Sequence, residues 1–198
     1  MKIKSLVLDS IKFYLTATIV CGGVYTVFVY GVGKLLFGSK VEGSLMVKNN
    51  TVVGSSLIGQ KFTAKKYFQS RPSAIDNNPA PSGASNLSWT SKDLQDQFNA
   101  RKKQFILDNS LTEAAAVPSD MLFASGSGVD PHISVEAAKM QINRVVKERS
   151  MPTGAGERIA DLIDTLAESS FFTSNWGKFV NTNMLNLKLD ELSVQYAK

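Results

Sequence analysis

The longest apolar stretch of the chain runs from Phe13 to Gly33, contains no charged residue, and is bounded by Lys12 and Lys34. As a helix it would span about 31 Å, close to the thickness of the hydrocarbon core of a bilayer. A cleaved signal peptide has a shorter apolar region, roughly 7–15 residues, followed by a small-residue cleavage site that the next residues match poorly. A buried core helix would usually be shorter and carry a polar face. The pattern therefore predicts one transmembrane helix.

Small residues gather on one face of this predicted helix. Thr18, Gly22 and Thr26 follow one another at intervals of four residues. In a bilayer, small residues at this spacing let a second helix approach closely. We expect this face to dock on a partner helix. The alternative is that glycine and threonine are simply frequent in membrane helices.

The apolar stretch divides the chain into three predicted parts. These are a short cytoplasmic head over residues 1–12, a transmembrane helix over 13–33, and one extracytoplasmic domain over 34–198. Three lysines precede the stretch and three follow it closely, so the positive-inside rule does not orient the helix. The short head favours this orientation. So does the single cysteine, Cys21 within the span, which leaves the folded part free of thiols.

The pattern beyond the membrane combines a β period with three helical periods. Two β-prone runs flank Asn49-Asn50, which predicts a hairpin over residues 44–55. Phe62, Tyr67 and Phe68 are predicted core residues, and residues 75–90 form a long loop by composition. Further elements are predicted as helices over residues 90–108, 134–148 and 157–168, and as a half-buried strand where Leu185, Leu187 and Leu189 alternate with polar residues.

Capping signals mark where two of these helices begin. Thr90 and Asp93 have the spacing of a capping box, and Ser134 precedes the apolar stripe of the second helix. A mixture of helices and short strands of this kind predicts an α+β domain. The roughly 160 residues after the span suffice for one domain with its own core.

The formal charge of the chain is +5, but much of it lies at the membrane boundary. Of 22 basic and 17 acidic residues, four and one precede residue 35, which leaves 18 and 16 in the folded part. This near balance is typical of an ordinary soluble surface and argues against a nucleic-acid-binding protein.

Residues 117–134, VPSDMLFASGSGVDPHIS, contain several side chains of the types that serve in catalytic and binding sites. They include Asp120, Ser125, Ser127, Asp130 and His132, the only histidine of the chain. A serine-nucleophile elbow of the Gly-x-Ser-x-Gly type is missing from this block. The glycines are not followed by the Lys-Ser/Thr of a phosphate loop, and a metal site would need a further histidine or cysteine.

A structural role explains the same block better. Gly126 and Gly128 give the backbone access to angles that other residues resist, and we expect at least one of them at positive φ. Asp130-Pro131 favours a turn before Ser134 starts a helix. The enzymatic alternative stays open at this point, with Ser127, Asp130 and His132 as its residues.

Several blocks together resemble the C subunit of the Kdp high-affinity potassium-transporting P-type ATPase. They are VP-x-D, SGSGVDPHIS, the helix with Gln141 and Arg144, and LNLKLD near the end, with SSLIGQKF, RPSA and SGASNL upstream. The chain departs from the family pattern at Ala84 and at residues 88–91, and it lacks the family's later histidine, of a His-Thr-Glu, in the helix ending Asp164-Thr165. The motif residues matched are Arg71, Pro72, Ser73, Asn86, Asp120, Ser125, Gly126, Ser127, Gly128, Asp130, Pro131 and His132.

The resemblance implies an accessory, non-catalytic subunit in the cell inner membrane. Its partners would be an A subunit that conducts potassium, a B subunit that hydrolyses ATP, and a small F subunit. The family is described as a catalytic chaperone that raises the ATP affinity of the B subunit, although ATP binds on the cytoplasmic side. The resemblance implies no firmly bound cofactor. It implies ATP only as part of a complex with the B subunit. One predicted helix cannot enclose an ion pathway, which agrees with an accessory role.

Overall fold

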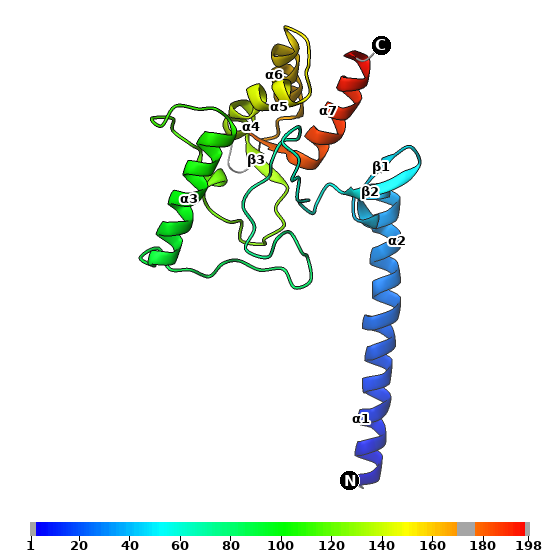
Figure 1. Ribbon diagram of the computed structural model, residues 1–198. Coiled ribbons are helices and arrows are strands. Elements are labelled where there is room, and N and C mark those ends of the chain that lie inside the picture. The colour runs from blue at the N-terminus through cyan, green and yellow to red at the C-terminus, as the bar shows by residue number, and fades with distance from the viewer. Residues whose placement is uncertain (1–2, 170–176, 197–198) are drawn as a thin grey trace. The chain divides into compact units, whose positions relative to one another are not determined.

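The computed structural model describes residues 3–169 and 177–196, and Figure 1 shows the order of the elements along the chain. Contacts within the chain divide it into two compact units, residues 1–53 and 54–198. The boundary falls within the second strand of the hairpin that follows the apolar helix, so only the earlier part of the hairpin is grouped with the helix. Each unit is described by itself.

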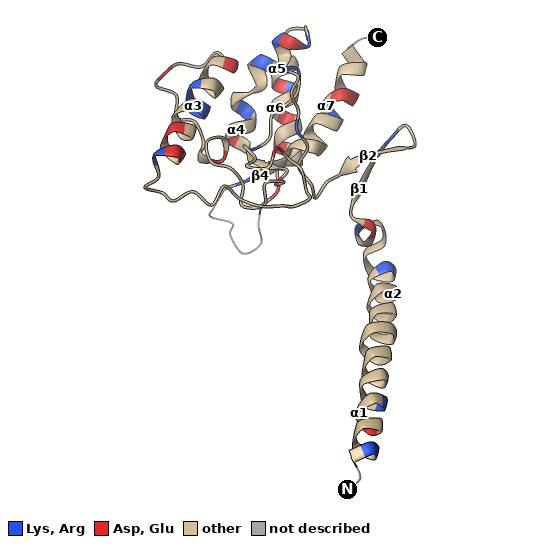
Figure 2. Ribbon diagram, turned by 60° about the horizontal axis from the view of Figure 1, so that its bottom comes forward, with Lys and Arg blue, Asp and Glu red and all other residues tan. Residues whose placement is uncertain are grey.

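The first unit is built on one continuous helical segment of 40 residues, from Ile3 to Glu42. It is long and apolar enough to cross a membrane, and none of its most apolar window is buried within the chain. Charged side chains occur only towards its two ends (Figure 2). The predicted apolar helix is thus confirmed and extends past residues 13–33 on both sides. Its parts are α1 (Ile3–Ala17), the π-helical η1 (Thr18–Val24), α2 (Tyr25–Phe37) and the 3-10 segment η2 (Gly38–Glu42).

The small-residue face lies across the π-helical segment. The Thr18 hydroxyl donates to the Tyr14 carbonyl at 2.8 Å, and the Thr26 hydroxyl to the Cys21 carbonyl at 3.5 Å. Both hydroxyls are therefore bonded within the helix. A Cβ added at Gly22 would meet no atom within 4 Å, so this side is open in the described part of the chain.

A hairpin follows the apolar helix, as the sequence predicted. β1 (Leu45–Lys48) pairs with β2 (Thr51–Ser55) across a two-residue turn. Asn49 and Asn50 have φ of 50° and 61°. Two positive φ angles in succession are what a type I′ turn requires, and asparagine tolerates them better than most residues.

The second unit packs short helices around a two-stranded antiparallel sheet, which confirms a mixed α+β domain. In the sheet, His132 lies opposite Asn181 and Ile133 opposite Val180. Helices α4 and α5 pack on α6, and α6 packs on α7. The elements are α3 (Lys92–Asp108), η3 (Ser119–Met121), β3 (His132–Ser134), α4 (Val135–Met140), α5 (Ile142–Glu148), α6 (Ala155–Leu166), β4 (Phe179–Asn181) and α7 (Thr182–Tyr196).

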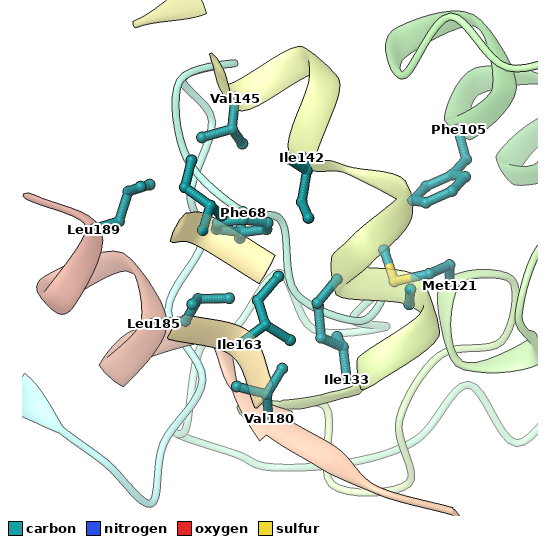
Figure 3. Packing of buried hydrophobic residues seen from close by; sticks show 13 residues of the cluster. Phe68, Phe105, Met121, Ile133, Ile142, Val145, Ile163, Val180, Leu185 and Leu189 are labelled. Carbon is teal, nitrogen blue, oxygen red and sulfur yellow. The ribbon is translucent and has the colours of Figure 1, made fainter. Parts of the chain in front are cut away.

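One apolar cluster forms the core of this unit (Figure 3). The apolar period of α6 predicts four inward residues, of which Ile159 and Ile163 are fully buried, whereas Leu162 and Leu166 are partly buried against the cluster. Of the three predicted aromatic core residues, Phe68 is fully buried, whereas Phe62 and Tyr67 are only partly buried. The other labelled members in Figure 3 are Phe105, Met121, Ile133, Ile142, Val145, Val180, Leu185 and Leu189.

The strand predicted from Leu185, Leu187 and Leu189 is wrong, because these residues belong to helix α7. Leu185 and Leu189 are buried one helical turn apart, while Leu187 is only partly buried. Asn186, which the alternation treated as solvent-facing, is 2% exposed. The apparent alternation therefore does not match the burial. The buried positions Leu185, Asn186 and Leu189 follow the spacing of one helix face.

Two details of the predicted helices are also corrected. The capping box at Thr90 is absent from the described structure, because Ser91 occupies the N-cap position and makes no side-chain cap hydrogen bond. The helix predicted over residues 134–148 is interrupted at Gln141, which separates α4 from α5. Ser134 does cap α4, since its hydroxyl accepts from the Ala137 N–H at 3.1 Å.

Residues 56–91, all of which the structure describes, contain neither helix nor strand. Part of the main chain of this segment is hydrogen-bonded by side-chain amides of the folded core. Asn186 accepts from the Phe68 N–H at 2.8 Å and donates to its carbonyl at 2.9 Å. Gln141 bonds Gln69 in the same two ways, at 2.8 and 3.2 Å. These amides supply partners that a sheet would otherwise give to a buried main chain.

Candidate functional site

The SGSGVDPHIS block holds four distant parts of the second unit together through its main chain. The Gly59 N–H donates to the Val129 carbonyl at 2.6 Å and the Gly83 N–H to the Ser127 carbonyl at 3.0 Å. The Ser125 N–H donates to the Pro72 carbonyl at 3.1 Å, and the N–H of Thr182, at the start of α7, donates to the Pro131 carbonyl at 2.8 Å. The block is therefore a structural junction for the irregular segment.

Gly128 has the backbone conformation that the sequence predicted, with φ of +72°. An added Cβ would lie 2.7 Å from the Gly83 carbonyl oxygen and against Ile75. Gly126 lies outside the left-handed region, and a Cβ there would meet no atom within 4 Å. The expectation is confirmed for Gly128, where strain and close approach both require glycine.

Three motif residues upstream of the block support the same junction. The Ser73 hydroxyl donates to the Gly128 carbonyl at 2.7 Å and accepts from the Ile75 and Asn77 N–H groups. The carbonyl of Pro72 receives the Ser125 N–H. Asn86 adopts φ of +52°, a conformation that asparagine tolerates in turns. RPSA and SGASNL thus act as parts of the fold around Gly128.

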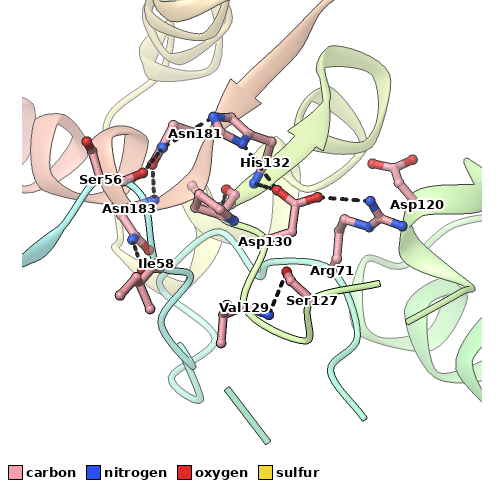
Figure 4. A network of polar contacts seen from close by, with 12 residues as sticks. Ser56, Ile58, Arg71, Asp120, Ser127, Val129, Asp130, His132, Asn181 and Asn183 are labelled. Carbon is pink, nitrogen blue, oxygen red and sulfur yellow. Dashed lines mark hydrogen bonds and ion pairs between the residues drawn. The ribbon is translucent and has the colours of Figure 1, made fainter. Parts of the chain in front are cut away.

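A charged and polar network crosses from Arg71 to the start of α7 (Figure 4). Arg71 Nη1 donates to Asp130 Oδ2 at 2.9 Å, and the His132 main-chain N–H donates to Asp130 Oδ1 at 3.0 Å. His132 Nδ1 lies 3.2 Å from the same Oδ1, and Nε2 lies 3.4 Å from Asn181 Nδ2. The side chains of Arg71, Asp130 and His132 are 27%, 28% and 33% exposed, so the network is partly buried.

The amide of Asn181 fixes the tautomer of His132. Its Oδ1 accepts from the Asn183 and Met184 N–H groups and so caps α7, while its Nδ2 donates to the Ser56 carbonyl at 2.7 Å. Turning the amide over would break all three bonds. Nδ2 therefore faces His132 as a donor, Nε2 is the acceptor, and Nδ1 carries the hydrogen that points at Asp130.

Asp130 is the ionisable centre of this network. Partial burial by itself raises the pKa of its carboxyl group. The hydrogen bonds from the His132 ring and main chain, together with the charge of Arg71 and its hydrogen bond, outweigh burial and lower the pKa below its ordinary value. Asp130 is therefore an ionised acceptor at neutral pH and holds Arg71 and His132 in place.

Asp120 has a separate structural role beside this network. Its Oδ2 accepts from the Ser134 N–H at 2.6 Å, and its Oδ1 from the Ser134 hydroxyl at 3.1 Å. Ser134 in turn caps α4. Asp120 is thereby engaged in positioning the first turn of that helix.

The arrangement does not support the enzymatic alternative. A serine nucleophile needs the free ring nitrogen of a histidine as its base. In the described structure His132 Nε2 faces Asn181, and the Ser127 hydroxyl accepts from the Val129 N–H at 3.2 Å. Ser127, Asp130 and His132 therefore do not form a relay. Within the described residues, no group of three histidine, cysteine, aspartate or glutamate side chains lies close enough to hold a metal ion.

A second buried network, which the sequence pattern did not predict, is centred on Arg144. This side chain bonds Asn109 Oδ1 at 2.9 Å, the Tyr67 carbonyl at 2.9 Å and Gln141 Oε1 at 2.7 Å, and it also bonds the Lys65 carbonyl. Burial lowers the pKa of the Arg144 guanidinium, partly offset by the charges of Asp108 and Glu148. Gln141 and Arg144 interrupt an apolar helical stripe, and that interruption was the available signal.

The family K+-transporting ATPase, c chain (KdpC), matches residues 7–191. A potassium-transporting ATPase KdpC subunit from Janthinobacterium sp. (strain Marseille) is 40% identical over 191 residues, covering 95% of this chain and 99% of that protein.

Two further relatives come from other bacteria. The KdpC subunit of Leptospira interrogans serogroup Icterohaemorrhagiae is 40% identical over 181 residues, covering 91% of each chain. That of Mycobacterium bovis (strain BCG / Pasteur 1173P2) is 37% identical over 187 residues, covering 93% of this chain and 97% of that protein. The matches include both the apolar helix and the folded unit, and the chain therefore belongs to the KdpC family of K+-transporting ATPase c chains.

Proposed function

We propose that this chain is the accessory, non-catalytic subunit of an ATP-driven potassium uptake complex and is needed for the assembly of that complex. The observation that carries the proposal is the KdpC match over residues 7–191, which includes the apolar helix and the folded unit together. The motif block supports it, because its polar residues are engaged in holding the domain together. The active site for ATP hydrolysis lies on another subunit.

The partners in this proposal are a potassium-conducting A subunit, an ATP-hydrolysing B subunit and a small F subunit. The chain crosses the cell inner membrane once, with residues 1–12 in the cytoplasm and the folded unit outside it. Thr18, Gly22 and Thr26 form the helix face that docks on partner helices. The open space around Gly22 supports this role, since close packing drives helix association in lipid.

The proposal includes the family role of catalytic chaperone, in which the subunit raises the ATP affinity of the B subunit. The chain binds no cofactor firmly on its own, and ATP is involved only in its complex with the B subunit. With the folded unit outside the cytoplasm, the effect on ATP affinity has to be transmitted through the membrane-spanning segments. The proposal thus treats the chaperone effect as a coupling between subunits, not as a nucleotide site on this domain.

A deletion tests the proposal directly. Removing residues 39–198 keeps the apolar helix and removes the folded unit. Cells that depend on the truncated chain should grow poorly at micromolar external potassium and normally when potassium is plentiful. The full chain, tagged after its last residue, should co-purify with the conducting and ATP-hydrolysing subunits. Normal uptake of scarce potassium by the deletion strain would refute the functional assignment.

The orientation is tested by labelling. Ser82 is exposed in the irregular segment, and Cys21 within the apolar helix is the only native thiol. With Ser82→Cys, a membrane-impermeant thiol reagent should label intact cells. Labelling that occurs only after lysis would place the folded unit in the cytoplasm.

A substitution at His132 separates an assembly subunit from an enzyme. His132→Gln removes the imidazole but keeps a polar side chain that can hydrogen-bond. An assembly subunit should lose only local packing, so growth at low potassium should be close to wild type. An enzyme that used this histidine as a base would lose its activity, commonly by a factor of 100 or more.

A further inference from the structure

Phe123 separates two hollows on the surface of the second unit. The first hollow, of about 260 Å³, is apolar, and its aromatic rings lie close together. The Phe123 ring centroid is 5.7 Å from that of Trp89 and 5.3 Å from that of Phe98. Trp89 is nevertheless 75% exposed. An indole stacked on its neighbour and facing solvent is preorganised to contact a further apolar group.

The second hollow, of about 700 Å³, lies on the other side of Phe123 and is charged. Its two carboxylates are already engaged, because both oxygens of Asp120 and of Asp130 accept hydrogen bonds within the domain. Its cationic side chains are not fully used. Within the described residues Arg71 donates only through Nη1, and neither its Nη2 nor the exposed amine of Lys178 has a hydrogen-bond partner.

The two hollows have complementary needs. The charged hollow has spare donors and engaged acceptors, so its ligand should bring an acceptor with negative charge. The apolar hollow should receive an aliphatic or aromatic side chain. Each volume is within or close to the range of protein binding sites, and the two meet at a single ring.

We infer that the two hollows together form a docking groove for a segment of a partner subunit that carries an apolar side chain and a carboxylate. The apolar side chain packs against Trp89 and Phe98, and the carboxylate pairs with Lys178 and Arg71. The inference rests on the proposed function, because the occupant is another subunit of the same complex. A membrane lipid would be a different occupant, and the experiment distinguishes it.

The test uses the complex solubilised in detergent and captured through a tag placed after the last residue of the full chain. The measured quantity is the dissociation rate of the complex from the immobilised chain. Trp89→Ala should raise this rate about tenfold or more, as expected for an aromatic anchor at an interface. Lys178→Glu should weaken binding by a similar factor. Two control variants should have dissociation rates within twofold of wild type. Leu107→Ala removes an exposed apolar side chain of α3, and Lys147→Glu reverses an exposed charge on α5.

A photo-crosslinking residue at position 89 identifies the occupant. The expected product is a crosslink to a partner-subunit peptide that contains an aspartate or a glutamate. A crosslink to lipid, or to a peptide without an acidic residue, would overturn the inference. Thermal unfolding of Trp89→Ala should match wild type, and Lys178→Glu provides an independent test if it does not.

The outcomes separate the two levels of the proposal. If the wild-type chain does not bind the complex at all, both the proposed function and the groove are refuted. If it binds, but Trp89→Ala and Lys178→Glu dissociate as slowly as their controls, only the groove is refuted. The function as an accessory subunit then stands, with its contacts elsewhere.

Discussion

Substitution of Gly128 should destabilise the folded unit because two costs coincide at this position. With φ of +72°, any side chain is held in the left-handed region, at a cost of about 1–2 kcal/mol. The new Cβ would also lie 2.7 Å from the carbonyl oxygen of Gly83. That oxygen belongs to the main chain, and the Gly83 N–H is tied to Ser127 at 3.0 Å. The clash is therefore not relieved by rotating a side chain.

The combined effect of Gly128→Ala should be about 3 kcal/mol, since overpacking alone costs roughly 1–3 kcal/mol. For a domain of this size, 1 kcal/mol shifts the midpoint of thermal unfolding by about 2–4 °C, so the midpoint should fall by roughly 6–12 °C. The assay is thermal unfolding of the full chain in detergent, followed by near-ultraviolet circular dichroism, which reports tertiary packing. A β-branched replacement should cost more.

Gly126→Ala is the matched control, because it changes the same residue type two positions away. Its φ lies outside the left-handed region, and the added Cβ meets no atom within 4 Å. Its midpoint should stay within about 2 °C of wild type, as for substitutions without a named source of strain. Equal midpoints for the two variants, or an unchanged midpoint for Gly128→Ala, would refute the reasoning.

Three further predictions concern the polar network and the apolar helix. The pKa of Asp130 is lowered in the folded state, so its charge stabilises the domain above the unfolded-state value of about 3.9, and this stability is lost as the pH falls through the lower folded value. Asp130→Asn should cost about 1–3 kcal/mol at pH 7, and urea titrations should show the difference from wild type shrinking below about pH 4; a constant difference would contradict this. Asn181→Ala should lower the free energy of unfolding by about 2 kcal/mol, measured by the same titration, because the α7 cap and the bond to the Ser56 carbonyl are lost. The control is Asn99→Ala, which replaces an exposed asparagine and should leave the free energy of unfolding unchanged. Gly22→Leu should leave membrane insertion intact but reduce co-purification with the partner subunits, whereas Gly23→Leu, also open, faces another side and should have little effect; if both are silent, the docking face lies elsewhere on the helix.

The sequence by itself determined the features that depend on local chemistry. The uncharged run between Lys12 and Lys34 is long and apolar enough to cross a membrane by its length and composition alone. Asn49-Asn50 tolerates two positive φ angles, which fixes the hairpin turn. Gly128 was one of two glycines expected at an unusual φ. The apolar period of α6 was also enough to predict this helix, because its apolar residues lie on one face and only that face can be buried.

The tertiary structure decided which polar residues are buried. Asn186, Gln141 and Arg144 look solvent-facing in the sequence, yet each is at most 4% exposed. Their partners include carbonyl and N–H groups of residues 65–69, about 70 to 120 positions away along the chain. No local pattern can reveal such a partner, so the period of α7 was misjudged and the break at Gln141 was missed. The same holds for Asn181, whose meeting with His132 depends on the pairing of β3 with β4, because side chains from distant strands become neighbours only when the sheet forms.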